Sequence, residues 1–139
     1  MKELSKARKG AVLISLAFLV FGIAVAHKVI EDRKQAASVA LHEIERLSLQ
    51  GDWKAAFALT SSAYKALANE VNFRGDFGFW TNGAAQFLPA IKLTGGFGIV
   101  EIRRSFSADA TSGLVFELVP EDDRWAINSP PARWTSTDW

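Results

Sequence analysis

Few residues of this 139-residue chain combine a reactive side chain with a spacing that supports catalysis. His42 opens the run His-Glu-Ile-Glu-Arg, which starts like a zinc-protease helix, but that motif needs a second histidine where Arg46 stands. The glycines at 95, 96 and 98 precede a predicted strand, whereas a phosphate-binding loop follows a strand and opens a helix. The chain also has no cysteine for thiolate chemistry. We therefore expect no metal site and no cofactor.

Three side chains remain as candidates for acid–base chemistry. Tyr64 is the only tyrosine, and its position predicts a core aromatic residue with its hydroxyl group at the rim. Asp76 lies among glycines, where a turn is favoured and a position facing a pocket is the alternative. His42 lies one position off the apolar stripe of a predicted helix, which is typical of a boundary residue. No acid–base pair follows from these positions, so we expect the protein not to be an enzyme.

The strongest feature of the sequence is residues 11–26, sixteen residues without a charge. They follow a basic arm, residues 1–10, that contains Lys2, Lys6, Arg8 and Lys9. Such a block close to the amino terminus predicts a segment addressed to a membrane. Small residues in it could pack against a neighbouring membrane helix, and these are Ala17, Gly22, Ala24 and Ala26.

Two fates are open for this segment. With flanking residues it can form a retained transmembrane helix over residues 11–30, since Lys28 can extend its side chain to the interface. Alternatively, Ala24-Val25-Ala26 matches the pattern cut by signal peptidase, and cleavage after Ala26 would make His27 the new amino terminus of a secreted protein. We favour the retained helix, because the helical pattern continues past the cleavage point.

Charge predicts the orientation of the chain. The cations before the apolar block keep the amino terminus cytoplasmic, so the rest of the chain crosses the membrane. In a bacterium this places a single-pass protein in the inner membrane with its domain in the periplasm. Residues 27–139 hold 12 Lys and Arg against 14 Asp and Glu, and this balance offers no basic stripe for nucleic acid.

The elements that must position these residues begin with two helices. Ala37, Leu41, Ile44 and Leu47 recur at helical spacing and predict an amphipathic helix over residues 29–49, continuous with the membrane segment. Gly51 can end it, and Asp52 can cap a second helix over residues 53–68.

A meander of antiparallel strands is predicted in the carboxy-terminal third. Apolar and polar residues alternate over residues 97–107 and 113–119, and a turn at 120–123 leads to a third strand that contains Trp125 and Ile127. The order of elements predicts an α+β domain over residues 31–129, in which a helix pair packs on a curved antiparallel sheet.

Two aromatic segments are candidates for partner binding. Residues 70–96 alternate aromatic residues with glycines, which predicts irregular structure with one or two short strands. Its aromatic residues either close one end of the domain as a plug, which we favour, or contact a partner through Phe77, Phe79 and Trp80. Residues 130–139 form a tail with Trp134 and Trp139, which either fold back onto the sheet or meet a partner. We expect the two prolines at 130 and 131 to direct this tail away from the sheet edge.

Two phrases resemble a known superfamily. Gly-Asp-Trp at the start of the second helix, followed by a meander that ends in Trp-Ala-Ile at 125–127, resembles the nuclear transport factor 2-like α+β domains, membrane-anchored periplasmic members included. The resemblance covers residues 33–129 and implies a cone-shaped fold that hosts enzymes, binding modules and scaffolds alike. Because its enzymes place Asp, His or Tyr in the mouth of the cone, it implies a pocket near His42, Tyr64 and Asp76.

These observations favour a non-catalytic, membrane-anchored subunit or assembly factor of a cell-envelope complex. Its partners would be other membrane or periplasmic proteins, with a second copy of the chain as one option. The alternative is a secreted or tethered protein that binds a small apolar molecule and has weak hydrolase or isomerase activity. A third hypothesis is a pilin-like subunit, because Lys9-Gly10 before an apolar helix resembles a prepilin processing point, although Ser15 replaces the expected glutamate.

Overall fold

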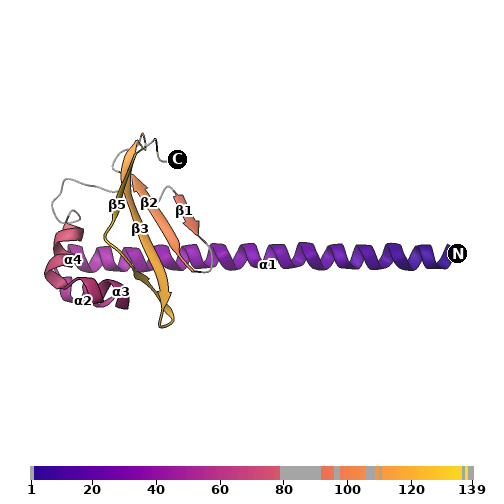
Figure 1. The fold of residues 1–139 in the computed structure, drawn as a ribbon, viewed down its shortest axis with the longest axis horizontal. Coiled ribbons are helices and arrows are strands. Elements are labelled where there is room, and N and C mark those ends of the chain that lie inside the picture. Colours follow the sequence, from indigo (N-terminus) through magenta and orange to yellow (C-terminus); the bar gives the residue numbers. More distant parts are fainter. Residues whose placement is uncertain are drawn as a thin grey trace. The chain divides into compact units, whose positions relative to one another are not determined.

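The computed structural model describes residues 2–78, 92–95, 98–105, 109, 111–135 and 137. These residues form an α+β structure with a long amino-terminal helix and an antiparallel sheet (Figure 1). The helices are α1 (Lys2–Leu49), α2 (Trp53–Ala58), α3 (Ser62–Leu67) and α4 (Glu70–Phe77). The strands are β1 (Lys92–Gly95), β2 (Val100–Ser105), β3 (Ser112–Glu121), β4 (Arg124–Ile127) and β5 (Ala132–Thr135).

The chain divides into two compact units, residues 1–32 and residues 33–139, and α1 runs through the boundary. The expected continuity of the apolar helix with the first helix of the domain is therefore confirmed. In the second unit, Ala37, Leu41 and Ile44 are buried in the core and Leu47 packs against it, as their spacing predicted.

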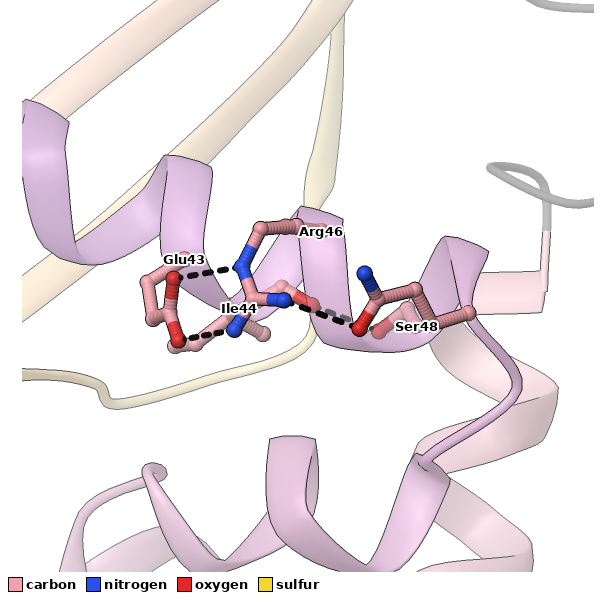
Figure 2. A network of polar contacts seen from close by, with 5 residues as sticks. Glu43, Ile44, Arg46 and Ser48 are labelled. Carbon is pink, nitrogen blue, oxygen red and sulfur yellow. Dashed lines mark hydrogen bonds and ion pairs between the residues drawn. The ribbon is translucent and has the colours of Figure 1, made fainter.

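Near its end α1 has a solvent face and a core face, and each carries its own local hydrogen bonds (Figure 2). On the solvent side, Arg46 donates to both carboxylate oxygens of Glu43, at 2.8 and 2.6 Å, and to the side chain of Gln50 at 2.8 Å. On the core side, the Ser48 hydroxyl is buried and donates to the Ile44 carbonyl at 2.8 Å. The bond satisfies a polar group that would otherwise be costly to bury.

The transition from α1 to α2 follows the sequence. Gly51 adopts a left-handed conformation with φ of 79°, which a residue without a side chain reaches most easily. The Asp52 carboxylate then accepts the Ala55 N–H at 3.1 Å and caps α2.

The expected single helix over residues 53–68 is wrong, because it divides into α2 and α3. Thr60 forms a β-bridge with Ile127, and the Ser61 N–H donates to the Ile127 carbonyl at 2.8 Å. The Ser61 hydroxyl then accepts the Tyr64 N–H at 3.0 Å and starts α3. This contact with the sheet replaces the helical hydrogen bonds at the break.

Residues 70–77 are also a correction, since they form helix α4 rather than irregular structure. Asn69 and Asn72 exchange side-chain and backbone hydrogen bonds at the start of α4, at 2.9 and 3.1 Å. Phe73 and Phe77 lie four residues apart and are both fully buried, with ring centroids 4.7 Å apart. Figure 1 shows α2, α3 and α4 gathered at the carboxy-terminal end of α1.

The predicted meander is confirmed by the pairing of β2, β3 and β4, which are antiparallel neighbours in the order of the chain. Its inward residues are buried, and Phe116 of β3 meets Phe77 of α4 with ring centroids 6.4 Å apart. The aromatic core therefore lies between the short helices and the sheet.

The carboxy-terminal segment returns to the sheet, as the fold-back alternative for Trp134 predicted, whereas the expectation that the two prolines direct it away from the sheet edge is wrong. Residues 132–135 form β5, which pairs with Ser112–Val115 of β3 on the edge that β4 occupies farther along. Ile127 pairs with Leu118 and Ala132 with Val115, so this edge advances five residues where β3 advances three. The two extra residues form an interruption that contains Pro130 and Pro131, and the prolines redirect the chain back onto the sheet.

Candidate functional site

The apolar stretch of α1 is the clearest candidate for a functional surface. An 18-residue segment of this helix has a mean hydropathy of 2.3, and none of that segment is buried inside the structure. Its large side chains are exposed on all sides, among them Phe18 at 72% and Phe21 at 68%. This helix is therefore long and apolar enough to cross a membrane. A signal sequence near an amino terminus has the same properties.

The four small residues of this stretch do not form one stripe. Gly22 and Ala26 lie four residues apart and share one face of the helix, whereas Ala17 and Ala24 lie seven apart and share another. All four are exposed, and a Cβ atom added to Gly22 would meet nothing within 4 Å. The two faces could thus serve two different neighbours.

The structure brings together two of the three predicted acid–base residues. The Tyr64 hydroxyl of α3 donates to Oδ2 of Asp76 in α4 at 2.6 Å. The ring of Tyr64 packs edge-on against Phe73, with centroids 6.1 Å apart, and its side chain belongs to the buried core. Asp76 is half-buried in a helix rather than in the favoured turn.

This environment decides what the pair can do chemically. Burial of the phenol, together with the hydrogen bond to the Asp76 carboxylate, raises the pKa of Tyr64 well above its ordinary value. A tyrosine that keeps its proton this firmly is a poor general acid or base near neutral pH. The pair instead joins α3 to α4, beside the ring contacts of Tyr64 with Phe73 and Phe77.

His42 lies apart from that pair in its contacts. Its side chain is 57% exposed, and Nδ1 is 3.5 Å from Oε2 of Glu45 on the same helix. The same carboxylate oxygen accepts from the Arg104 guanidinium at 2.5 Å. Glu45 lies in α1 and Arg104 in β2, so this ion pair joins the helix to the strand. Arg104 is buried, and the carboxylate compensates its charge there.

The predicted partner-binding aromatics fall into two groups. Phe77 is fully buried, and Trp134 is 2% exposed in β5, where its indole N–H donates to the Leu114 carbonyl at 3.3 Å. Neither side chain offers its surface to a partner, and Trp134 follows the fold-back alternative. Phe79, Trp80 and Trp139 lie outside the described residues.

Trp134 explains a glycine in the strand opposite. Gly113 pairs with Trp134, and a Cβ atom at position 113 would lie 1.9 Å from the Arg104 carbonyl oxygen and 2.8 Å from the indole nitrogen. Only glycine leaves room for the backbone and the indole together.

Sequence reasoning missed the contacts of the β3–β4 hairpin, residues 120–125. The Glu121 carboxylate accepts the Ser62 N–H at 2.9 and 3.0 Å and the Ser62 hydroxyl at 3.1 Å. The Arg124 guanidinium donates to the Leu59 carbonyl at 2.7 Å and to the Ala58 carbonyl at 3.2 Å. An anion thus meets the start of α3 and a cation the end of α2, which is the favourable arrangement for both helix dipoles.

No group of His, Asp and Glu side chains that could hold a metal ion occurs among the residues with a described placement. No protein-family model matches the chain, and no curated protein or solved structure is significantly similar to it. The features of the molecule that bear on function are therefore the apolar stretch of α1 and the fold of the second unit.

Proposed function

We propose that the protein is a non-catalytic, membrane-anchored subunit or assembly factor of a cell-envelope complex. The observation that carries this proposal is the exposed apolar stretch of a helix that continues into a folded α+β unit. The anchor sets the location of the domain, and the domain supplies the surface that other proteins recognise.

The proposed topology follows from charge. Lys6, Arg8 and Lys9 precede the apolar stretch and keep the amino terminus in the cytoplasm, so the second unit lies in the periplasm of a bacterium. In this topology Gly22 and Ala26 are available to one neighbouring membrane helix, and Ala17 and Ala24 to another.

The proposed fold relationship is to the nuclear transport factor 2-like domains. A long helix, a capped second helix after Gly51-Asp52 and an antiparallel meander whose last strand contains Trp125-Ala126-Ile127 support it, whereas β5 follows that strand in the same sheet. That fold hosts several kinds of function, so the absence of a poised acid–base pair at Tyr64 and Asp76 favours recognition over catalysis.

The direct experiment is purification of the full chain from native membranes in mild detergent, with quantification of the proteins that accompany it. We expect partners at fixed stoichiometry. Trp139→Ala tests the recognition role of the end of the chain, and we expect it to lower partner retention without changing the melting temperature. Trp134→Phe is the matched variant. We expect it to lower partner retention only as far as it lowers the melting temperature of the sheet.

Two results would contradict the proposal. The first is a chain that purifies from membranes alone under conditions that preserve other envelope complexes. The second is a chain recovered in the soluble fraction with a bound apolar small molecule, which would support the pocket-protein alternative.

A further inference from the structure

We propose that the first unit carries a binding site for an anionic phospholipid, formed by Arg8, Lys9, Val12 and Leu13 of α1. The inference rests on the proposed function, because it needs the apolar stretch of α1 to be anchored in a bilayer. All four residues belong to the first unit, residues 1–32. The occupant is a lipid whose phosphate meets the two cations and whose acyl chain covers the two apolar side chains.

The site is an open hollow on the surface of α1. Its volume is about 440 Å³, and it is lined by Arg8, Lys9, Val12 and Leu13. Arg8 and Val12 lie four residues apart, as do Lys9 and Leu13, so the four side chains share one side of the helix. Each of these two rows runs from a cation to an apolar side chain, as a phospholipid runs from its phosphate to its acyl chain.

Both parts of the hollow are available to a ligand. Arg8 and Lys9 are exposed, and among the side chains that the structure describes no carboxylate forms an ion pair with either. Val12 and Leu13 are 67% and 66% exposed. A free phosphate ion would meet the cations alone, whereas a phospholipid would also cover the apolar pair, so the hollow suits the lipid.

The depth of the cations matches the phosphate layer of a bilayer. Arg8 and Lys9 precede Ala11, where the apolar stretch begins, by three and two residues, which is about 3–5 Å along a helix axis. The headgroup region adds roughly 5–8 Å to each side of the hydrocarbon core. With the apolar stretch in that core, both cations lie among the lipid phosphates.

The charge of the hollow selects the class of lipid. The Arg8 guanidinium can donate two parallel hydrogen bonds to one phosphate, and the Lys9 ammonium adds a compact positive charge beside it. A zwitterionic lipid also brings an ammonium or choline group, which the two cations repel. An anionic lipid brings negative charge alone, and basic residues beside a membrane are attracted to it for this reason.

The test measures which lipids contact the full chain in a membrane. The chain is reconstituted into phosphatidylcholine vesicles that contain spin-labelled phosphatidylglycerol or spin-labelled phosphatidylcholine. The motionally restricted fraction of each labelled lipid gives its relative association with the chain. We expect the native chain to favour phosphatidylglycerol several-fold, and Arg8→Gln with Lys9→Gln to lose most of this preference.

Two further variants separate a local site from a general effect of charge. Ala7→Lys with Lys9→Ala keeps the net charge, but residues 7 and 9 are about 200° apart around the helix, so one cation moves to the opposite side. We expect this variant to lower the preference for phosphatidylglycerol as Lys9→Gln does. Lys28→Gln removes a lysine beyond the other end of the apolar stretch and should leave the preference unchanged.

Equal association of the two lipids with the native chain, in a chain that stays in the vesicles, overturns the inference and leaves the anchor intact. An undiminished preference in Ala7→Lys with Lys9→Ala also overturns it, because net charge rather than the hollow would then attract the lipid. Loss of the chain from the vesicles overturns the anchor and the inference together.

Discussion

The apolar residues of α1 fall into two groups that differ in what surrounds them. The first group, from residue 11 to residue 26, is uncovered on every side. The second consists of Ala37, Leu41 and Ile44, which form one stripe, pack in the core and leave polar residues on the opposite face. The same helix therefore carries two patterns that suit two solvents, hydrocarbon all round and protein on one side. Equivalent substitutions in the two groups should therefore change different quantities: membrane insertion in the first group and folding stability in the second.

The largest effect is expected from a charge placed in each group. Ile44→Asp buries a carboxylate in a fully covered position and should cost more than about 4 kcal/mol, enough to unfold the second unit. Val20→Asp should leave the melting of that unit unchanged and weaken membrane insertion by about 3 kcal/mol. Denaturant unfolding in detergent and resistance to carbonate extraction measure the two effects. Equal destabilisation by both variants would show that the first group also packs against the domain.

A second pair of variants compares two glycines. Gly113→Ala forces a methyl group against the Arg104 carbonyl oxygen and should destabilise the sheet by about 3 kcal/mol. Gly22→Ala meets no atom and should leave the second unit as stable as before, with a helix gain of about 1 kcal/mol. Urea unfolding followed by tryptophan fluorescence separates them. An unchanged urea midpoint for Gly113→Ala would mean that β2 does not approach β3 at Gly113 as described.

Elements of the fold differ in how far the sequence predicted them. An uncharged run and a periodic stripe are local patterns, so the long helix, the capped start of α2 and strands β2 to β4 could be predicted. Helix α4 was missed because Gly75 and Gly78 suggested turns, although Phe73 and Phe77 at helical spacing were a signal for it. Strand β5 was missed because two prolines usually end a sheet edge.

The candidate site was harder to predict, because its contacts join distant parts of the chain. Tyr64 and Asp76 were named separately, but the hydrogen bond between them depends on how α3 meets α4. The Glu121 carboxylate reaches Ser62 across a separation of 59 residues, and no local pattern encodes that contact. Pairs of this kind are decided by tertiary packing.

A smaller effect is expected from Tyr64, which belongs only to the folded unit. Tyr64→Phe removes the donor to Asp76 and should cost about 1 kcal/mol at neutral pH. Because the folded state raises the pKa of Tyr64, its contribution is complete below the unfolded pKa of about 10 and is lost as the pH rises above that value. Urea midpoints measured from neutral to alkaline pH should therefore fall in the native chain and less so in Tyr64→Phe. Equal decline in both chains would contradict the assignment.

The smallest effect is expected at the hairpin turn. Asp123 has a φ of 60°, so Asp123→Gly should stabilise the second unit by about 0.5–1 kcal/mol without changing membrane extraction. Gly51→Ala, at a φ of 79°, is the matched opposite change and should destabilise it by a similar amount. Thermal melting compares the two, and a loss of stability in Asp123→Gly would mean that the aspartate side chain contributes more than the backbone relief.

The most direct test of the two-solvent account is the intact mass and amino-terminal sequence of the protein extracted from membranes. The account predicts a chain that begins at Met1, resists carbonate extraction and retains the apolar stretch. A mature chain that begins at His27 would contradict it, because the stretch would then be a removed signal. A start at Ala11 would contradict it in another way and favour the pilin-like hypothesis.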